Sequence, residues 1–359
     1  MGAVFKRKGK EMSSFTVLFW ILVVPVTIVL GLAASWIVRK VSALVQWRVG
    51  PPLFQPAYDV MKLMGKEILI PEEANRSVFM MAPLVGVVGV LLLSLILWNA
   101  LVAKESFMGD SIVAIYLMVL PSLALILGGS ASASPHASVG TAREMKLVIG
   151  YELPLVLAFI VVLIKTGGQL SLITISQAVP VLSISGMLAF IVALLCVQAK
   201  LGFVPFDIAE AETELGSGVL MEYSGALLAL WKVMQAVMLV ALPFFLMVLF
   251  LGGYGTNYLT GVGGIAAVVL LAVFAVGRFM SGRSKLMDVV GLLSFIGVCI
   301  LAGLGKYVLI LVLLILIKNT NPRLRIDQAM KFFWVYCSVT LVAAIILASL
   351  GSHYEISWL

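Results

Sequence analysis

The stretch KLGFVPFDIAEAETELGSGVLMEYSG, residues 200–225, is unusually acidic although it lies between two long apolar runs. It contains one base, Lys200, and five of the chain's 17 acidic residues, which are Asp207, Glu210, Glu212, Glu214 and Glu222. Asp207, Glu210 and Glu214 have the spacing i, i+3, i+7, which predicts that they share one face if this part is helical. Because like charges repel, and more strongly when they are desolvated, the cluster indicates a function or a nearby cation. A solvated acidic loop is the alternative, but its apolar flanks FVPF and GVLM would then also lie in water.

The composition indicates a polytopic membrane protein. Of the 359 residues, 62% are hydrophobic and 11% are charged, whereas a soluble domain has about 25% charged residues. The three cysteines form no CxxC pair and the two histidines are far apart, so we expect no iron–sulfur or metal site in this chain. We also find no nucleotide-binding glycine motif and no nucleophile elbow. The net charge of +7 arises in loops between apolar runs, which favours membrane topology over a nucleic-acid partner.

Apolar runs of spanning or near-spanning length recur along the chain. They cover residues 14–38, 78–103, 111–129, 147–164, 181–199, 226–251, 262–277, 286–318 and 329–350. The run 286–318 allows two interpretations, one long tilted helix or a pair of short spans that meet near Gly303–Lys306. We therefore expect an all-α transmembrane bundle of about eight to ten spans, with additional interfacial helices on its cytoplasmic side.

The loop charges favour an even number of spans. With ten spans, sixteen Lys and Arg residues lie on one side of the membrane and six on the other. The positive-inside rule makes the richer side cytoplasmic, although the basic tail 1–13 then lies outside. The polar loops all fall on the cytoplasmic side, namely 39–77, 130–146, 200–225, 278–285 and 318–330. Function is therefore expected on this face of a cell membrane protein.

The first of these loops reads QWRVGPPLFQPAYDVMKLMGKEILIPEEANR. Gly50-Pro51-Pro52 is expected to break the preceding helix. An apolar stripe at helical spacing then predicts a helix along the membrane interface, formed by Phe54, Tyr58, Met61 and Met64. Lys62 and Lys66 fall on a neighbouring face. An ordinary amphipathic linker would have the same pattern.

The second loop leads into a span with Arg143, Glu144 and Lys146 at its head and Glu152 further in. An ionisable group at membrane depth indicates a functional site. A carboxylate at a helix end that reaches water is the alternative interpretation.

The last loop, KNTNPRLRIDQAMKFFW, begins at residue 318. Its Arg323 and Arg325 are natural cations for the carboxylates of the acidic stretch. Anchors that simply follow the positive-inside rule would occupy the same place.

Four motifs together resemble the H subunit of respiratory complex I and its relatives, among them the membrane anchor subunits of energy-converting [NiFe]-hydrogenases. They are R-V-G-P…Q-P…D-V-x-K-L…K-E at Arg48–Glu67, Y-E-L-P at Tyr151–Pro154, P-F-D-I-A-E-A-E-T-E-L…E-Y-S-G at Pro205–Gly225, and P-R-L-R-I-D-Q at Pro322–Gln328. The resemblance covers about residues 14–252 and 300–350, and the third motif is the most specific.

Departures from the complex I pattern resemble the hydrogenase branch. The first loop is short, Ser134-Pro135-His136 and Arg143-Glu144-Met145 are similar to hydrogenase motifs, and Ala209 replaces a proline usual in complex I. The family usually has eight spans, so ten spans require an added helical hairpin. The predicted division is a basic tail at 1–13, a core of six spans at 14–252 that resembles the complex I protein, an extra hairpin at 253–300, and C-terminal spans at 301–359.

The resemblance implies a membrane protein without a redox centre of its own. Such a protein anchors a hydrophilic electron-transfer arm made of [NiFe]-hydrogenase-like large and small subunits, which carry iron–sulfur clusters and, in a hydrogenase, the [NiFe] centre. It also leads a line of buried charges toward antiporter-like membrane subunits. The expected function is to couple a ferredoxin-linked redox reaction to proton or sodium translocation.

Site residues follow from this resemblance and from the charges. The coupling carboxylates would be Asp207, Glu210, Glu212, Glu214, Glu222, Glu152 and Glu144. Their charge partners would be Arg143, Lys146, Arg323, Arg325 and Arg48. The redox arm would contact Gln55, Asp59, Lys62, Lys66 and Glu67. Two other functions stay open: a quinone-chamber subunit of an NADH-quinone oxidoreductase, and a stand-alone secondary transporter, which would predict internal repeats.

Overall fold

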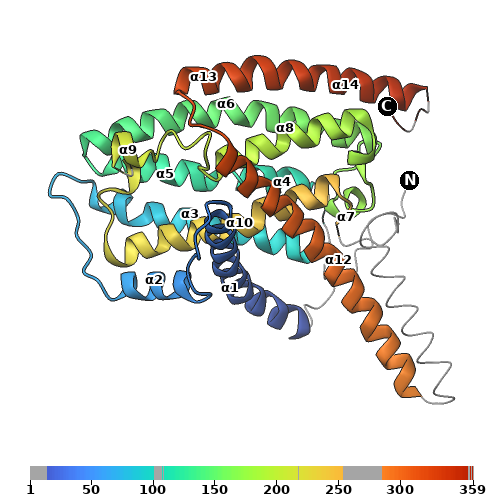
Figure 1. The fold of residues 1–359 in the computed structure, drawn as a ribbon, viewed down its shortest axis with the longest axis horizontal. Coiled ribbons are helices and arrows are strands. Elements are labelled where there is room, and N and C mark those ends of the chain that lie inside the picture. Colours follow the sequence, from blue (N-terminus) through green and yellow to red (C-terminus); the bar gives the residue numbers. More distant parts are fainter. Residues whose placement is uncertain are drawn as a thin grey trace, which may run out of the picture.

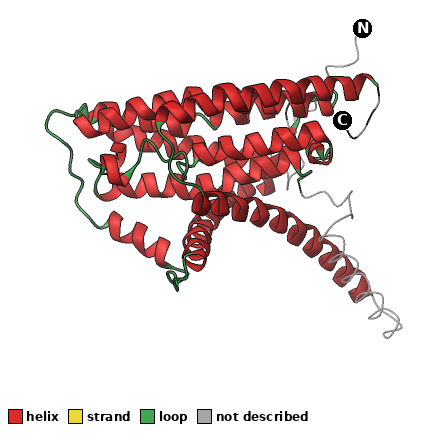
Figure 2. Ribbon diagram, turned by 45° about the horizontal axis from the view of Figure 1, so that its top comes forward, coloured by secondary structure: helices red, strands yellow, loops and turns green. Residues whose placement is uncertain are grey.

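A computed structural model describes residues 14–100, 107, 109–216, 218–253, 285–354, 356 and 358, with backbone alone for 14–19, 212–213 and 285–302. Within these ranges every regular element is a helix, as Figure 2 shows, and this confirms the expected all-α fold. The long helices lie side by side as a bundle, from which α1 and α12 diverge (Figure 1).

The elements of the described chain alternate between long helices and short turns. The long ones are α1 (Ser14–Val45), α3 (Arg76–Trp98), α6 (Pro135–Lys165), α8 (Ile184–Lys200), α10 (Gly225–Phe250), α12 (Lys285–Thr320) and α14 (Ser338–His353). The shorter ones are α2 (Gln55–Met64), α4 (Asp110–Leu117), α5 (Leu120–Ala131), α7 (Leu172–Ile175), α9 (Glu212–Leu215) and α13 (Ile326–Lys331). Two 3₁₀ turns, η2 (Pro180–Leu182) and η3 (Gly218–Leu220), and a π-helical turn, η4 (Phe332–Cys337), complete the order.

Seven helical segments of the described chain are long and apolar enough to cross a membrane. A bent pair, Leu172–Leu182 with Ile184–Lys200 at 106°, makes an eighth if it counts as one span. The predicted run 262–277 and the rest of 254–284 lie outside the described residues, so the extra hairpin stays a prediction. The helical bundle itself agrees with the sequence.

The apolar helix α10 forms the centre of the bundle. Most of its side chains are buried, including Trp231 and Met234, as expected of a helix that is hydrophobic all round. It contacts α1, α2, α3, α8 and α12. Small residues let neighbouring backbones approach: a Cβ at Gly31 would lie 2.7 Å from the carbonyl oxygen of Ala236. The α10 helix therefore fixes the relative positions of the elements that carry the site.

The structure decides between the two interpretations of the run 286–318 and corrects one helix boundary. The run does not break near Gly303–Lys306, because α12 is one continuous helix, so the pair of short spans behind the count of ten is not formed. The second polar loop is also shorter than 130–146, because α6 begins at Pro135. Proline is favoured at the first position of a helix, where its missing N–H would have no partner. Arg143, Glu144 and Lys146 therefore lie within α6.

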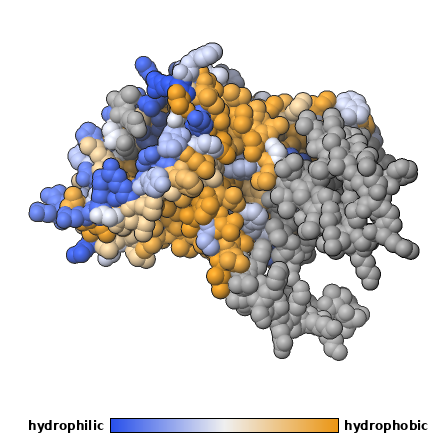
Figure 3. Space-filling model, turned by 60° about the horizontal axis from the view of Figure 1, so that its bottom comes forward, coloured by the Kyte–Doolittle hydropathy of each residue, from blue (hydrophilic) through white to orange (hydrophobic). Residues whose placement is uncertain are grey.

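The hydrophilic residues gather at one end of the molecule, as Figure 3 shows, while apolar side chains cover most of the remaining described surface. This polar end contains α2, α9, α13 and the loop between α8 and α10 (Figure 1). The acidic stretch 200–225 thus lies at the same end as the first loop and the loop before α13.

Candidate functional site at the polar end of the bundle

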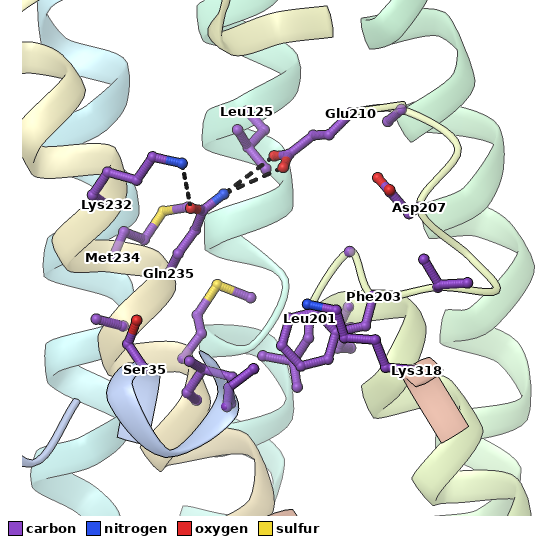
Figure 4. A pocket seen from close by; sticks show the side chains of 18 of the residues that line it. Ser35, Leu125, Leu201, Phe203, Asp207, Glu210, Lys232, Met234, Gln235 and Lys318 are labelled. Carbon is purple, nitrogen blue, oxygen red and sulfur yellow. Dashed lines mark hydrogen bonds between the residues drawn. The ribbon is translucent and has the colours of Figure 1, made fainter. Parts of the chain in front are cut away.

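A cavity of about 500 Å³ lies at the polar end, between the loop 201–211 and the helices α1, α2, α6, α8, α10 and α12 (Figure 4). Its walls combine apolar side chains with charges. The ionisable residues that line it are Arg39, Asp59, Glu144, Lys200, Asp207, Glu210, Lys232, Lys318 and Arg323. A largely apolar space of this kind with a few polar groups is the usual form of a binding or reaction site.

The loop 201–211 forms one wall and is irregular rather than helical. Pro205 cannot continue a helix, because it has no N–H to donate. Phe206, Ile208 and Ala209 are buried and anchor the loop in the bundle. The prediction that Asp207, Glu210 and Glu214 share a helix face was therefore wrong, and each carboxylate has different neighbours.

Contacts from α8, from the loop before α13 and from η4 hold this loop in place. The Gln198 side chain of α8 donates to the carbonyl oxygen of Val204 at 2.8 Å. The backbone N–H of Leu324 donates to the carbonyl oxygen of Pro205 at 3.0 Å. The centre of the Phe206 ring lies 4.7 Å from the centre of the Phe333 ring in η4. The acidic loop is thus attached both to α8 and to the last span.

Two arginines from outside the acidic stretch pair with its carboxylates. Arg323 donates to Asp207 at 2.9 Å, and Arg143 donates to Glu214 at 2.6 Å. The hydrogen bond from Arg143 lowers the pKa of Glu214, an exposed carboxyl. Glu214 therefore stays ionised at neutral pH and acts as a charge partner of α6.

Glu210 has a different environment, which Figure 4 shows. It is half-buried, lines the cavity, and accepts hydrogen bonds from the Gln235 amide at 3.3 and 3.4 Å. Burial raises the pKa of Glu210 to about 7, Lys232 opposes this rise, and Asp207 adds to it. The protonation of Glu210 therefore changes near neutral pH.

Two more carboxylates lead from the cavity along α6. Glu144 is buried, lines the cavity and lies beside Ser122 of α5. Glu152 is eight residues further along the helix, about 12 Å away at 1.5 Å per residue. It forms an ion pair with Lys200, whose side chain is fully buried. Ionisable groups thus extend from the cavity into the bundle.

Lys200 was not predicted as a charge partner, although it is the single base of the acidic stretch. Besides Glu152, it donates to the carbonyl oxygen of Met118 at 3.3 Å. Its ammonium also lies 5.0 Å from the centre of the Tyr151 ring. The sequence did contain one indication of this role, the position of Lys200 at the end of an apolar run, because a buried ammonium needs a counter-charge.

The cavity also holds residues that no sequence pattern indicated. Lys232 and Gln235 come from α10, inside an apolar run. Lys318 comes from α12, and its ammonium lies 4.3 Å from the centre of the Phe203 ring. Their meeting with Glu210 and Asp207 depends on the fold.

The residues predicted to contact a redox arm divide into two groups. Asp59 accepts from Arg39 at 2.7 Å and from Gln55 at 3.0 Å, and the bond from Arg39 lowers its pKa. Asp59 and Gln55 are half-buried, with Asp59 facing the cavity. The remaining three are exposed, namely Lys62, Lys66 and Glu67.

The other predicted residues do not line the cavity. Arg48, Lys146 and Arg325 are exposed, and Arg325 lies close enough to Glu214 to affect its charge. Glu222 is half-buried just before α10, and among the described residues no ion pair involves it. The side chain of Glu212 lies outside the described part of the structure.

Comparisons with known proteins agree on one family. The family described as "NADH dehydrogenase" matches residues 17–349. The H subunit of the NADH-quinone oxidoreductase of Syntrophotalea carbinolica is 33% identical over 85% of this chain and 87% of its own length. The H subunit of the same enzyme in Dehalococcoides mccartyi is 29% identical over 92% of this chain and 87% of its own length.

A solved structure has the same fold. A chain of the membrane-bound sulfane sulfur reductase, an archaeal respiratory membrane complex, superposes with a TM-score of 0.75 at 24% sequence identity. The match covers 93% of the present chain and 99% of that chain. The structural neighbour therefore shows the same fold along almost the whole of both chains.

Proposed function

The chain belongs to the NADH dehydrogenase family, and on this basis we propose that it is the membrane anchor and coupling subunit of an ion-translocating, complex I-like oxidoreductase. The observation that carries the proposal is the cavity in which Glu210 can exchange a proton near pH 7 beside the buried Glu144. A coupling subunit needs such a group, because its charge must change under working conditions.

In the proposed mechanism, this chain converts a change of charge at its polar end into proton movement along α6. Glu210 and Glu144 line one cavity, so the charge on either alters the proton affinity of the other. Proton uptake at Glu210 removes its repulsion of Glu144. Further along α6, the Glu152–Lys200 pair responds to the charge on Glu144 by Coulomb interaction inside the bundle.

We assign the remaining cytoplasmic charges to positioning and to partner contacts. Asp207 with Arg323 and Glu214 with Arg143 join the acidic loop to its neighbours. The exposed Lys62, Lys66 and Glu67 would face the hydrophilic arm, and the apolar flanks of the bundle would face lipid and antiporter-like subunits. On this proposal the polar end faces the cytoplasm of a cell with a multi-pass plasma membrane complex.

For the type of complex, we propose a ferredoxin-linked hydrogenase or a close relative. The support is the short first loop, Ser134-Pro135-His136 and Ala209, which are similar to the hydrogenase branch. The partner subunits would then carry the iron–sulfur clusters and the metal centre. Purification of the native complex tests this: a large subunit with four nickel-binding cysteines is expected, and a large subunit without them would overturn the hydrogenase assignment.

A quinone chamber is the second candidate, and the cavity itself favours it. Apolar side chains such as Leu32, Val38 and Phe203 line a space of about 500 Å³, and the two sequence relatives carry quinone in their names. A photoreactive quinone analogue should then label the cavity residues in the intact complex. If an excess of free quinone does not reduce this labelling, the result would count against a quinone chamber.

The coupling role is tested with Glu210→Gln in the intact complex, reconstituted in sealed vesicles. We expect electron transfer to continue while ion translocation per electron falls at least tenfold. Glu73→Gln, which changes an exposed carboxyl that does not line the cavity and is assigned to no contact, is the matched control and should translocate normally. Undiminished translocation by the Glu210→Gln complex would refute the coupling role, and transport by the isolated chain would instead support a stand-alone transporter.

A further inference from the structure

A chain of three side chains crosses one wall of the cavity, as the dashed lines in Figure 4 show. The Lys232 ammonium donates to the Gln235 Oε1 at 3.4 Å. The Gln235 Nε2 donates to both oxygens of Glu210, at 3.3 and 3.4 Å. Lys232 and Gln235 are three residues apart on α10 and so share a face, whereas Glu210 comes from the loop 201–211.

The chemistry of the two ends fixes the orientation of the amide in the middle. An ammonium can only donate hydrogen bonds, and an ionised carboxylate can only accept them. The Gln235 oxygen must therefore face Lys232, and its NH₂ group must face Glu210. Lys232 thus prevents the amide from turning its oxygen toward Glu210 to accept a bond from the protonated acid.

We propose that Gln235 is a positioning residue whose amide, oriented by Lys232, holds Glu210 toward the cavity and selectively stabilises its ionised form. This inference rests on the proposed coupling role of Glu210. It assigns the control of proton exchange to a neutral side chain and a lysine of α10.

The amide also keeps the cation and the carboxylate apart. A direct ion pair would strongly favour the ionised acid, as Arg143 does for Glu214. With the Gln235 amide between them, the Lys232 ammonium stabilises the Glu210 carboxylate from a longer distance and through two hydrogen bonds in series. Burial raises the pKa of Glu210 to about 7, and Lys232, held at this distance, opposes the rise only in part.

The other charges around Glu210 come from every element of the cavity wall. Asp207 of the same loop and Glu144 of α6 oppose its ionisation. The other charged residues that line the cavity are Arg39, Asp59, Lys200, Lys318 and Arg323. Arg39 is paired with Asp59, Lys200 with Glu152, and Arg323 with Asp207. Lys318 packs against the Phe203 ring and interacts with Asp207. Among the described groups, Gln235 bonds to Glu210 directly and Lys232 is the cation that favours its ionised form.

The test is an infrared titration of the intact complex in lipid nanodiscs from pH 5 to 9. The carboxyl C=O band that disappears in Glu210→Gln reports the protonation of Glu210. Gln235→Met removes both hydrogen bonds but keeps a side chain of similar length between Lys232 and Glu210. We expect its midpoint to rise by about one pH unit, a tenfold higher proton affinity, since one pKa unit is close to the value of one hydrogen bond to a charged group.

Two further variants keep the test independent of one substitution. Lys232→Met changes an exposed side chain and should also raise the midpoint, because the charge and the fixed amide orientation are both lost. Gln235→Glu preserves the size and should raise it through like-charge repulsion. The matched control is Asn319→Met, because the Asn319 amide donates to Ser42 at 3.1 Å and Ile315 at 2.7 Å and does not line the cavity.

The outcomes separate this inference from the proposed function. Midpoints of the assembled Gln235 and Lys232 variants that coincide with the unmutated one would overturn the role of Gln235, even if Glu210→Gln stops translocation. If the midpoints rise, the pH profile of translocation should move with them. A profile that stays in place would leave Gln235 as the positioning residue of Glu210 and would refute the coupling role of Glu210 itself.

Discussion

At the level of single residues, the pair of the buried Lys200 with the half-buried Glu152 is the deepest ion pair of the described residues. Lys200 is fully buried and ends α8, and Glu152 belongs to α6. Desolvation of two charges is costly, so such a pair adds little net stability, but removal of one partner leaves the other charge without compensation. The pair therefore fixes the relative position of α6 and α8.

Lys200→Met is expected to destabilise the assembled complex, because the half-buried Glu152 carboxylate loses its partner, and the loss should stay below the ~3–5 kcal/mol of a fully buried pair. The double variant Lys200→Met with Glu152→Gln should recover most of this loss, since both charges are then gone. Thermal unfolding in detergent measures the two midpoints. A double variant that is less stable than Lys200→Met would show that the pair does not act as a unit.

Glu210 should make the stability of the protein depend on pH. Its pKa is about 7 in the folded protein, above its ordinary value of 4.5, so the folded state binds more protons between these two values. The contribution of Glu210 to the free energy of unfolding should therefore be fully present below pH 4.5. It should fall as the pH rises toward 7. Unfolding midpoints between pH 5 and 8 should show this slope, and Glu210→Gln should reduce it.

Glu214→Gln is the matched control for that slope. The hydrogen bond from Arg143 lowers the pKa of Glu214, so its contribution is fully present above its ordinary value and is lost only in more acidic solution. It should leave the dependence between pH 5 and 8 unchanged. An equal effect of both substitutions would mean that burial of Glu210 is not the cause.

The sequence predicted some partners of these residues and missed others for a physical reason. Arg143 and Arg323 were predictable as cations for the acidic stretch, because cations in polar loops have few other counter-charges. Lys232 and Gln235 lie inside an apolar run and Lys318 at the end of one, where a single polar residue follows no period that reveals its partner. Their contacts with the loop 201–211 form only when the helices pack.

At the level of elements, the acidic loop depends on a close contact between two backbones. Gly218 of η3 has a φ of +54° and lies so near the loop that a Cβ would be 2.1 Å from the carbonyl oxygen of Ala209. Gly140 of α6 adjoins the same place, where a Cβ would be 3.1 Å from that oxygen. Glu210 follows Ala209 directly, so this packing sets where its side chain begins.

Gly218→Ala should therefore move the loop as well as strain it. Gly216→Ala is a matched control, because Gly216 has a similar φ of +58° but its Cβ would lie 3.8 Å from the nearest atom, the Met221 sulfur. The backbone strain costs about 1–2 kcal/mol at either position. Only Gly218→Ala should lose further stability and shift the titration of Glu210, and equal losses would contradict the close-contact explanation.

The elements that the sequence predicted wrongly also have a physical explanation. The carboxylate spacing in 207–214 agrees with a helix, but Pro205 and the buried Phe206, Ile208 and Ala209 impose an irregular path. Gly303 and Gly305 suggested a break in 286–318, yet α12 continues through them. A glycine costs a helix only about 1 kcal/mol, whereas unpaired backbone groups in a membrane cost more.

At the scale of the whole molecule, the polar end combines a charged cavity with exposed apolar side chains. The stripe predicted from the sequence lies on and before α2, and Phe54, Tyr58, Met61 and Met64 are each more than half exposed. Sequence periodicity revealed this stripe because it depends on local spacing alone. What covers it depends on neighbours outside this chain, either lipid at the membrane interface or the hydrophilic arm of the proposed complex.

We expect the arm to cover the stripe, and Tyr58→Asp with Met61→Asp should then release it. Full burial of one large apolar side chain contributes about 1.5–3 kcal/mol. Two charges in place of Tyr58 and Met61 should therefore weaken the contact between the stripe and the arm so much that the arm no longer assembles. The arm subunits should move to the soluble fraction while this chain stays in the membrane. Leu182→Asp, at an exposed apolar residue of η2, should keep the arm attached, because η2 precedes the start of α8 whereas the acidic loop follows its end. If the double variant keeps the arm, the stripe belongs to the membrane interface instead. A helix that rests on lipid can leave the membrane surface without releasing a protein partner.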